Sequence, residues 1–288
     1  MKIDITYRYE TRDQSSKSLP ADSNAAVRRL CEGNRSFAAL FDDAAKETHR
    51  AETIVHLDPR DVGLSSAGTK EIPKQQPFAA IIGCADARVP IELIFNQGPN
   101  DLFVLRVAGN GLGTEVLGSL RYAIDHLDGL RLIVVLGHSG CGALSTAVDV
   151  FLNPSRYLPL ATKYTLRSII DPLLAVVQAS ARQLLTAFGA DLASHPKYRT
   201  ILIEASIATN AALAAYSIEQ ELGAIGPEKL RSVYGVYLLE TRKVWAPGPN
   251  DIEEPRLAPP PRDATKFAEF GEAIVRSQRI RSLLEQAD

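Results

Sequence analysis

Two short apolar segments, each followed directly by a potential metal ligand, constrain the fold more than any other feature of the chain. Residues 78–83 (Phe-Ala-Ala-Ile-Ile-Gly) precede Cys84, and residues 132–137 (Leu-Ile-Val-Val-Leu-Gly) precede His138. Short continuous apolar runs are typical of strands buried on both faces, as in parallel sheets. Ligands of open α/β sheets bind beyond the carboxyl ends of the strands. The sequence therefore predicts a parallel sheet with Cys84 and His138 at the same end of its strands.

A third apolar run, residues 102–105, lies between these two segments in the sequence. The stretch 114–127 carries apolar residues at helical spacing, which predicts a crossover helix. We expect the 78–83 strand at the centre of the sheet, with the 102–105 and 132–136 strands on either side. The predicted fold class is α/β, with an open, mostly parallel central sheet flanked by helices, an N-terminal helical arm and a C-terminal helix.

The residues that follow the two strands form a possible zinc site. Cys84 begins the run Cys-Ala-Asp-Ala-Arg, and His138 begins the run His-Ser-Gly-Cys, which ends at Cys141. A lone cysteine most often packs as a small hydrophobic residue, which is how we interpret Cys31. Two thiols and an imidazole, each close to a strand end, instead favour zinc with one coordination position left over, as catalytic zinc sites have.

Asp86 is a candidate for that fourth position. Its carboxylate belongs to the ligand types that zinc accepts. Arg88, two residues further on, could draw the carboxylate away from the metal in a charge-assisted pair. The alternative for Asp86 and Arg88 is a simple surface ion pair.

These motifs and their surroundings resemble the β-class carbonic anhydrase family. The matching stretches are 30–37, 84–90, 98–110, 135–142 and 233–241. The resemblance implies a β-carbonic-anhydrase-like fold and the reversible hydration of carbon dioxide to bicarbonate and a proton, by attack of a zinc-bound hydroxide. Zinc makes such a nucleophile available by lowering the pKa of bound water to about 7.

The resemblance also implies roles for individual residues. Cys84, His138 and Cys141 would bind Zn²⁺. Asp86 would either ligate the zinc in a closed state or turn to Arg88 and accept a hydrogen bond from the hydroxide. The residues that match substrate-binding positions are Gln75, Phe103, Tyr122 and Ala108. Without the resemblance, Phe103 is an ordinary core residue of a strand and Tyr122 an ordinary aromatic residue on a helix face.

Some positions depart from the family pattern. Val107 stands where an asparagine is usual, and Ile81 stands where family members with a bicarbonate-inhibited form have tryptophan. Because these departures alter the pocket wall, a second function stays an alternative: that of a related zinc hydrolase acting on carbonyl sulfide or carbon disulfide. A non-catalytic zinc- and bicarbonate-binding homologue is a further alternative, although Gln75, Asp86 and Arg88 would have no use there. The family builds its pocket at a subunit boundary, which implies a homodimer or a multiple of dimers.

Composition excludes several other classes. Hydrophobic residues make up 45% of the chain and charged residues 23%, and the formal net charge is −2. The sequence has no cluster of lysine and arginine interleaved with aromatic residues, which is the pattern expected of a nucleic-acid-binding protein. No apolar run approaches the ~20 residues of a membrane span, and the first residues lack the apolar stretch of a signal peptide. Three cysteines, two of them needed as thiolates, favour a cytoplasmic location.

We divide the chain into an N-terminal arm and helix (1–41), a zinc-binding α/β catalytic domain (42–244, with insertions near 42–74 and 150–199), and a proline-rich linker with a C-terminal helix (245–288). The other predicted elements are a weakly structured arm over 1–20, a helix from Asp22 or Ser23 to 41, a charged helix and loop over 42–74, helices over 166–188 and 208–222, strands over 200–204 and 232–240, and an amphipathic helix near 264–286.

Overall fold

A five-stranded sheet forms the centre of the computed structural model, which describes residues 3–10, 19–45, 51–62, 72–221, 230–248 and 254–285. Its order is β4-β3-β5-β6-β7, and all pairings are parallel except that of β6 with β7. The strands are β3 (Ala79–Gly83), β4 (Leu102–Arg106), β5 (Leu132–His138), β6 (Arg231–Tyr237) and β7 (Val244–Trp245). The predicted position of the 78–83 strand, between the other two, is confirmed, and so is the fold class.

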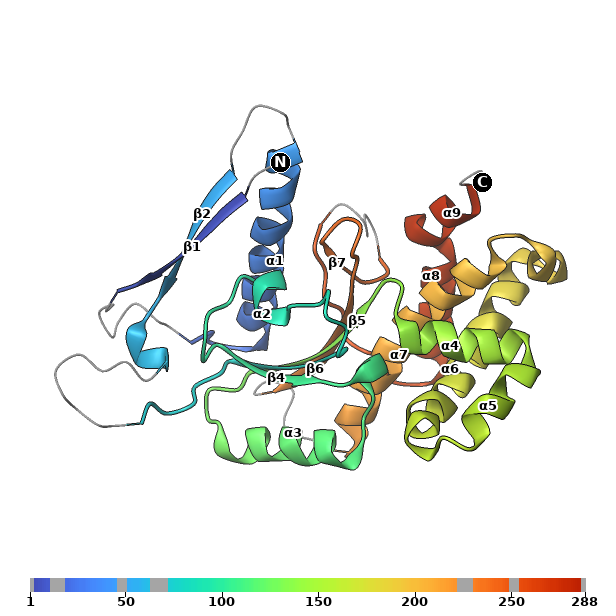
Figure 1. Ribbon diagram of the computed structural model, residues 1–288, viewed down its shortest axis with the longest axis horizontal. Coiled ribbons are helices and arrows are strands. Elements are labelled where there is room, and N and C mark those ends of the chain that lie inside the picture. Colours follow the sequence, from blue (N-terminus) through green and yellow to red (C-terminus); the bar gives the residue numbers. More distant parts are fainter. Residues whose placement is uncertain are drawn as a thin grey trace.

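Helices cover both faces of this sheet (Figure 1). They are α1 (Ser23–Ala45), α2 (Ile91–Ile94), α3 (Thr114–His126), α4 (Gly142–Leu152), α5 (Leu158–Ala161), α6 (Tyr164–Phe188), α7 (Tyr198–Glu221), α8 (Ala264–Arg276) and α9 (Gln278–Glu285). Short 3₁₀ turns lie at Pro59–Val62, Ala108–Asn110, Pro154–Tyr157 and Ala190–Ser194. Alternate residues of β3 enter different cores: Ile81 packs with α1 and α2, and Ile82 with α3, α4, α6 and α7. The strand is therefore apolar on both faces, as its sequence predicted.

The predicted strand over 200–204 is wrong, because these residues lie inside the long helix α7. Ile201, Leu202 and Ile203 are all buried there, together with the small residues that follow them. A short apolar run has no periodicity that separates a buried strand from a helix buried on all sides. By length and composition α7 could cross a membrane, but 83% of its most apolar 18-residue stretch is buried inside the fold.

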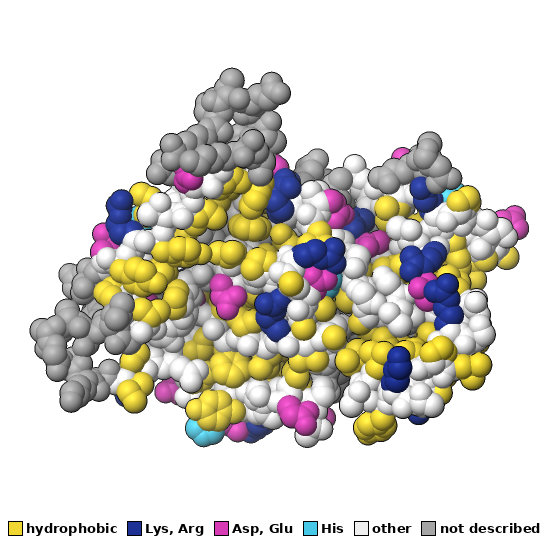
Figure 2. Space-filling model, viewed as in Figure 1, with side chains coloured by type: hydrophobic (Ala, Val, Ile, Leu, Met, Phe, Trp, Pro, Cys, Tyr) yellow, Lys and Arg dark blue, Asp and Glu magenta, His cyan; other side chains and the backbone are white. Residues whose placement is uncertain are grey.

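The N-terminal predictions also need correction. Residues predicted as a weakly structured arm form β1 (Ile3–Tyr9), which pairs in parallel with β2 (Ala51–Leu57), where a charged helix was predicted. Helix α1 continues beyond the predicted end at 41, to Ala45. The two strands form a separate sheet (Figure 1), and Figure 2 shows hydrophobic side chains exposed on this part of the surface. The exposed side chains are Ile5, Tyr7, Tyr9 and Ile54.

The C-terminal segment returns to the sheet. The proline-rich stretch forms an antiparallel bridge between Tyr234 and Ala258, so part of it adds to the sheet beside β6. The predicted final strand ends at Tyr237 rather than at 240. The single helix predicted near 264–286 is two helices, because Ser277 adopts an extended conformation between α8 and α9. The three-part division of the chain stays a prediction.

Glycine 33 sets how closely α1 approaches the segment that follows the Cys84 loop. A β-carbon at Gly33 would lie 1.9 Å from the carbonyl oxygen of Phe95, at the end of α2. Because a backbone atom cannot yield, Gly33→Ala should lower the free energy of unfolding by about 2–4 kcal/mol in urea titrations. Gly118→Ala is the matched control, since a β-carbon there meets nothing within 4 Å, and it should stabilise α3 by about 0.5–1 kcal/mol. Equal effects of the two changes would contradict this packing.

Candidate metal centre

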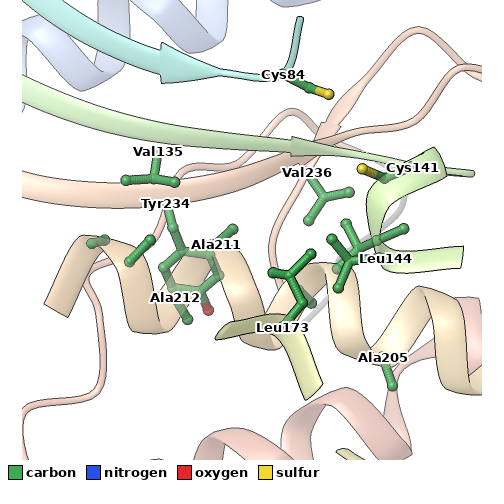
Figure 3. Packing of buried hydrophobic residues seen from close by; sticks show 14 of the residues in the cluster. Cys84, Val135, Cys141, Leu144, Leu173, Ala205, Ala211, Ala212, Tyr234 and Val236 are labelled. Carbon is green, nitrogen blue, oxygen red and sulfur yellow. The ribbon is translucent and has the colours of Figure 1, made fainter. Parts of the chain in front are cut away.

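Neighbouring parallel strands bring the predicted zinc ligands together. Cys84 follows the last residue of β3, His138 is the last residue of β5, and Cys141 precedes the first residue of α4. One ligand atom from each lies within 4.8 Å of the other two, and all three residues are buried. Figure 3 shows the sulfur atoms of Cys84 and Cys141 beyond the strand ends, near the beginning of α4. The parallel register places them there.

His138 offers a free nitrogen to this cluster. Its Nδ1 lies 3.1 Å from the carbonyl oxygen of Ser139. Because a carbonyl oxygen only accepts, Nδ1 carries the proton and Nε2 has a lone pair. Nε2 is buried and finds no hydrogen-bond partner among the described residues. An unpaired buried polar atom costs about 1–3 kcal/mol. A zinc ion bound to Nε2 would remove this cost, so the three residues fit the metal.

The two thiols, Cys84 and Cys141, shift each other's pKa in opposite directions. A hydrogen bond from Cys141 lowers the pKa of Cys84 well below its ordinary value, against the effect of burial, and backbone N–H groups add to this. The Cys84 thiolate in turn raises the pKa of Cys141, and burial raises it further. The pair therefore loses its first proton easily and its second only with difficulty. A divalent cation between the sulfurs would take the place of the second proton.

Asp86 is turned toward Arg88. The Arg88 guanidinium donates to both carboxylate oxygens, at 3.0 Å and 2.7 Å, and the Arg88 backbone N–H donates at 2.9 Å. These hydrogen bonds hold the pKa of Asp86 well below its usual range. The Oδ2 atom of Asp86 nevertheless lies only 3.9 Å from Nε2 of His138. Asp86 is thus beside the ligand cluster but outside it.

The substrate-binding predictions fall at different places. Ala108 begins the 3₁₀ turn after β4, and the backbone N–H of Gly109 in that turn bonds to Cys84. Phe103 is half-buried in β4 and packs on the core around α3, α4, α6 and α7. Ala108 thus lies near the cluster, whereas Phe103 pairs in register with Ala80, four residues before Cys84, and lies toward the amino ends of the strands.

Gln75 and Tyr122 are not brought to the cluster within one chain. Gln75 precedes β3, whose ends are ~13 Å apart. The adjacent Gln76 N–H bonds to Asn100, just before β4, which fixes this segment at the amino ends of the strands. Tyr122 is 49% exposed on α3 and stacks on His126. Whether the two residues serve a pocket stays a prediction.

A layer of polar residues that the motifs did not indicate surrounds the loop between His138 and Cys141. Ser139 Oγ donates to Glu240 at 2.8 Å, and the Gly140 N–H donates to Glu204 at 3.1 Å. Arg279 of α9 forms ion pairs with both glutamates. Burial raises the pKa of Glu240, but the charge and hydrogen bond of Arg279 outweigh burial and lower it. Ser139 belongs to a recognised motif, whereas no spacing in the sequence links Arg279 to it.

Arg106 and Asn210 hold the backbone around Cys84. Arg106 donates to the backbone carbonyl of Cys84 at 3.1 Å and also to that of Asp86. Asn210 of α7 donates to the carbonyl of Gly109 at 2.9 Å. A side chain of β4 therefore holds the backbone of the Cys84–Asp86 segment, and a side chain of α7 holds the turn that contains Gly109.

Comparison with known proteins identifies the family. A model of the carbonic anhydrase family matches residues 79–222, half of the 288 residues, and this range contains every residue of the Cys-His-Cys cluster. The chain belongs to the β-class carbonic anhydrase family. Carbonic anhydrase 2 of Mycobacterium tuberculosis is 41% identical over 124 residues, and a carbonic anhydrase of Mycolicibacterium smegmatis is 38% identical over 125. Each of these matches covers 43% of this chain and 52% of the relative, so the chain spans about half the length of the curated relatives that it matches.

The fold agrees with this family. The Coccomyxa β-carbonic anhydrase, solved in complex with acetazolamide, superimposes with a TM-score of 0.51. The match covers 90% of this chain and 97% of that one, at 22% sequence identity. This likeness shows that the β-carbonic anhydrase fold extends over most of the chain, well beyond the zinc motifs.

Proposed function

We propose that this chain is a zinc-dependent carbonic anhydrase that interconverts carbon dioxide and water with bicarbonate and a proton. The observation that carries the proposal is the buried cluster of Cys84, His138 and Cys141, with its unpaired Nε2 atom. When bound, zinc supplies a Lewis acid that makes water nucleophilic at neutral pH. Membership of the family supports carbon dioxide as the substrate.

The chain's own residues have distinct parts in this proposal. Cys84, His138 and Cys141 would hold the metal through two sulfurs and one nitrogen. Asp86, held by Arg88, offers a carboxylate oxygen beside His138 that can accept a hydrogen bond from the reacting water. Ala108 would give part of the apolar wall that an uncharged gas molecule needs.

We further propose that the active form is a homodimer or a multiple of dimers in the cytoplasm. Gln75 lies at the wrong end of β3 to reach its own cluster, so a second copy would have to supply it. The exposed apolar side chains of β1 and β2 give each copy surface to bury against another (Figure 2). The three free cysteines favour a reducing compartment.

Stopped-flow measurement of carbon dioxide hydration tests the function. The zinc-loaded protein should hydrate carbon dioxide, lose this activity after zinc is removed with a chelator, and regain it when zinc is added back. The same samples should be assayed with carbonyl sulfide and carbon disulfide. Hydrolysis of either compound without carbon dioxide hydration would replace the proposal with the related zinc hydrolase. No turnover by zinc-loaded protein would favour the non-catalytic zinc-binding role.

A further inference from the structure

The C-terminal helix α9 places one arginine against the loop that carries two of the proposed zinc ligands. The Arg279 side chain is only 11% exposed and lies between Glu204 of α7 and Glu240, which follows β6. Figure 1 shows the C-terminal helices beside the end of the sheet from which α4 begins. Nearly nine-tenths of this charged side chain is therefore withdrawn from water. In the sequence, Arg279 lies far from the metal motifs.

Each glutamate divides its two oxygens between Arg279 and the loop. Glu204 accepts from the Gly140 N–H through Oε1 and from Arg279 through Oε2. Glu240 accepts from Ser139 Oγ through Oε2 and from Arg279 through Oε1. The planar guanidinium joins the two carboxylates because its donors form a fixed fork. Arg279 thus bridges two residues that in turn hold Ser139 and Gly140.

Ser139 and Gly140 are the only residues between His138 and Cys141. Ser139 is fixed on further sides, because its backbone N–H donates to the Tyr237 carbonyl and its Oγ accepts from the Leu239 N–H. The conformation of this two-residue link decides where the imidazole and the second sulfur point.

Without Arg279, the two carboxylates beside the His138–Cys141 loop would lose the cation that pairs with both of them. The Glu204 side chain is only 8% exposed, so water could do little to stabilise its charge. A buried charge that loses its partner is costly, and the surrounding structure moves to reduce that cost. The loop bonded to the carboxylates would move with them.

We propose that Arg279 is a positioning residue for the zinc centre: it acts through Glu204 and Glu240 to hold the His138–Cys141 loop in the geometry that binds the metal. The inference rests on the zinc centre of the proposed function, and it assigns to the C-terminal helix a role in metal retention. Packing of α9 is served by the buried neighbour Ile280, which a change at Arg279 leaves in place.

Chelator competition on the full-length zinc protein tests this role, together with the absorption spectrum of the cobalt-substituted protein. Arg279→Met should weaken zinc retention about 10–100-fold, the range found when residues behind metal ligands are changed. It should also alter the cobalt–thiolate absorption. Arg279→Lys should recover part of the retention, because lysine keeps the charge but lacks the fork.

Arg276→Met is the matched control. Arg276 is the last residue of α8, three positions before Arg279; it is 73% exposed and pairs only with Glu272 on its own helix among the described contacts. It should leave zinc retention and the cobalt spectrum unchanged. If Arg279→Met lowers the melting temperature but leaves both metal readouts at wild-type values, Arg279 is structural and the inference is wrong.

Two further results separate this inference from the proposed function. If Arg279→Met does not fold, Glu240→Gln provides a milder test, since it removes one charge but keeps an acceptor for Ser139; unchanged zinc retention in that variant would overturn the inference. Wild-type protein that binds zinc tightly but hydrates no carbon dioxide would refute the function, while zinc loss in Arg279→Met would still support the positioning role.

Discussion

Cys84→Ser is expected to remove stoichiometric zinc and to lower kcat/KM for carbon dioxide hydration by about a thousand-fold or more. Cys84 provides one of the two sulfurs in a cluster whose ligand atoms lie within 4.8 Å of one another. A serine hydroxyl is nearly the same size as a thiol, but it does not ionise near neutral pH and is a poor ligand for zinc. The loss should therefore come from the metal and not from the packing of the core.

Cys31→Ser is the matched control for this change. Cys31 lies in α1, is half-buried and belongs to no ligand cluster among the described residues. It should retain zinc and full activity. Metal content by atomic emission and hydration by stopped flow should be measured on both variants. A zinc content that stays near one per chain in Cys84→Ser would contradict the assignment of this sulfur.

Arg88→Met is expected to lower kcat/KM at neutral pH about 10–100-fold without loss of zinc. Arg88 holds Asp86 through two side-chain hydrogen bonds. Even in this held position, the Asp86 carboxylate lies only 3.9 Å from His138 Nε2. A small rotation would let this carboxylate compete with water for the open coordination position. In the wild-type protein, the Arg88–Asp86 ion pair would therefore keep the open coordination position accessible to water.

Two comparisons decide whether Arg88 acts in this way. Arg121→Met removes an arginine of similar exposure that pairs with Asp125 on α3, and it should have no effect on hydration. The double variant Asp86→Asn/Arg88→Met has no anionic group to block the metal but keeps an amide oxygen that can accept the hydrogen bond of the reacting water, so it should be more active than Arg88→Met alone. If the double variant is no more active than the single one, Asp86 does not block the position.

The central site follows closely from the sequence because its determinants are local. A strand buried on both faces has to be continuously apolar, and the first polar residue after it has to lie at the end of the sheet. Cys84 and His138 occupy those positions in β3 and β5. Parallel pairing then brings them together without any further assumption.

Other features depend on signals that are weaker or less local. Residues 200–204 lie in a helix buried on all sides, where an apolar run has no period to reveal its conformation. Ile3, Ile5, Tyr7 and Tyr9 alternate with polar residues, a period of two that indicates β1 but is easily overlooked in a polar segment. The contact of Arg279 with Glu204 depends on the break at Ser277 and on the path of the linker, so no pattern near Arg279 could have revealed it.

X-ray absorption at the zinc edge of freshly purified protein tests the central claim most directly. We expect one zinc per chain with two sulfur ligands at about 2.3 Å and one imidazole nitrogen at about 2.0–2.1 Å. The sulfur contribution should disappear with the metal in Cys84→Ser and persist in Cys31→Ser. Protein without stoichiometric zinc, or zinc bound without two sulfurs, would contradict the account.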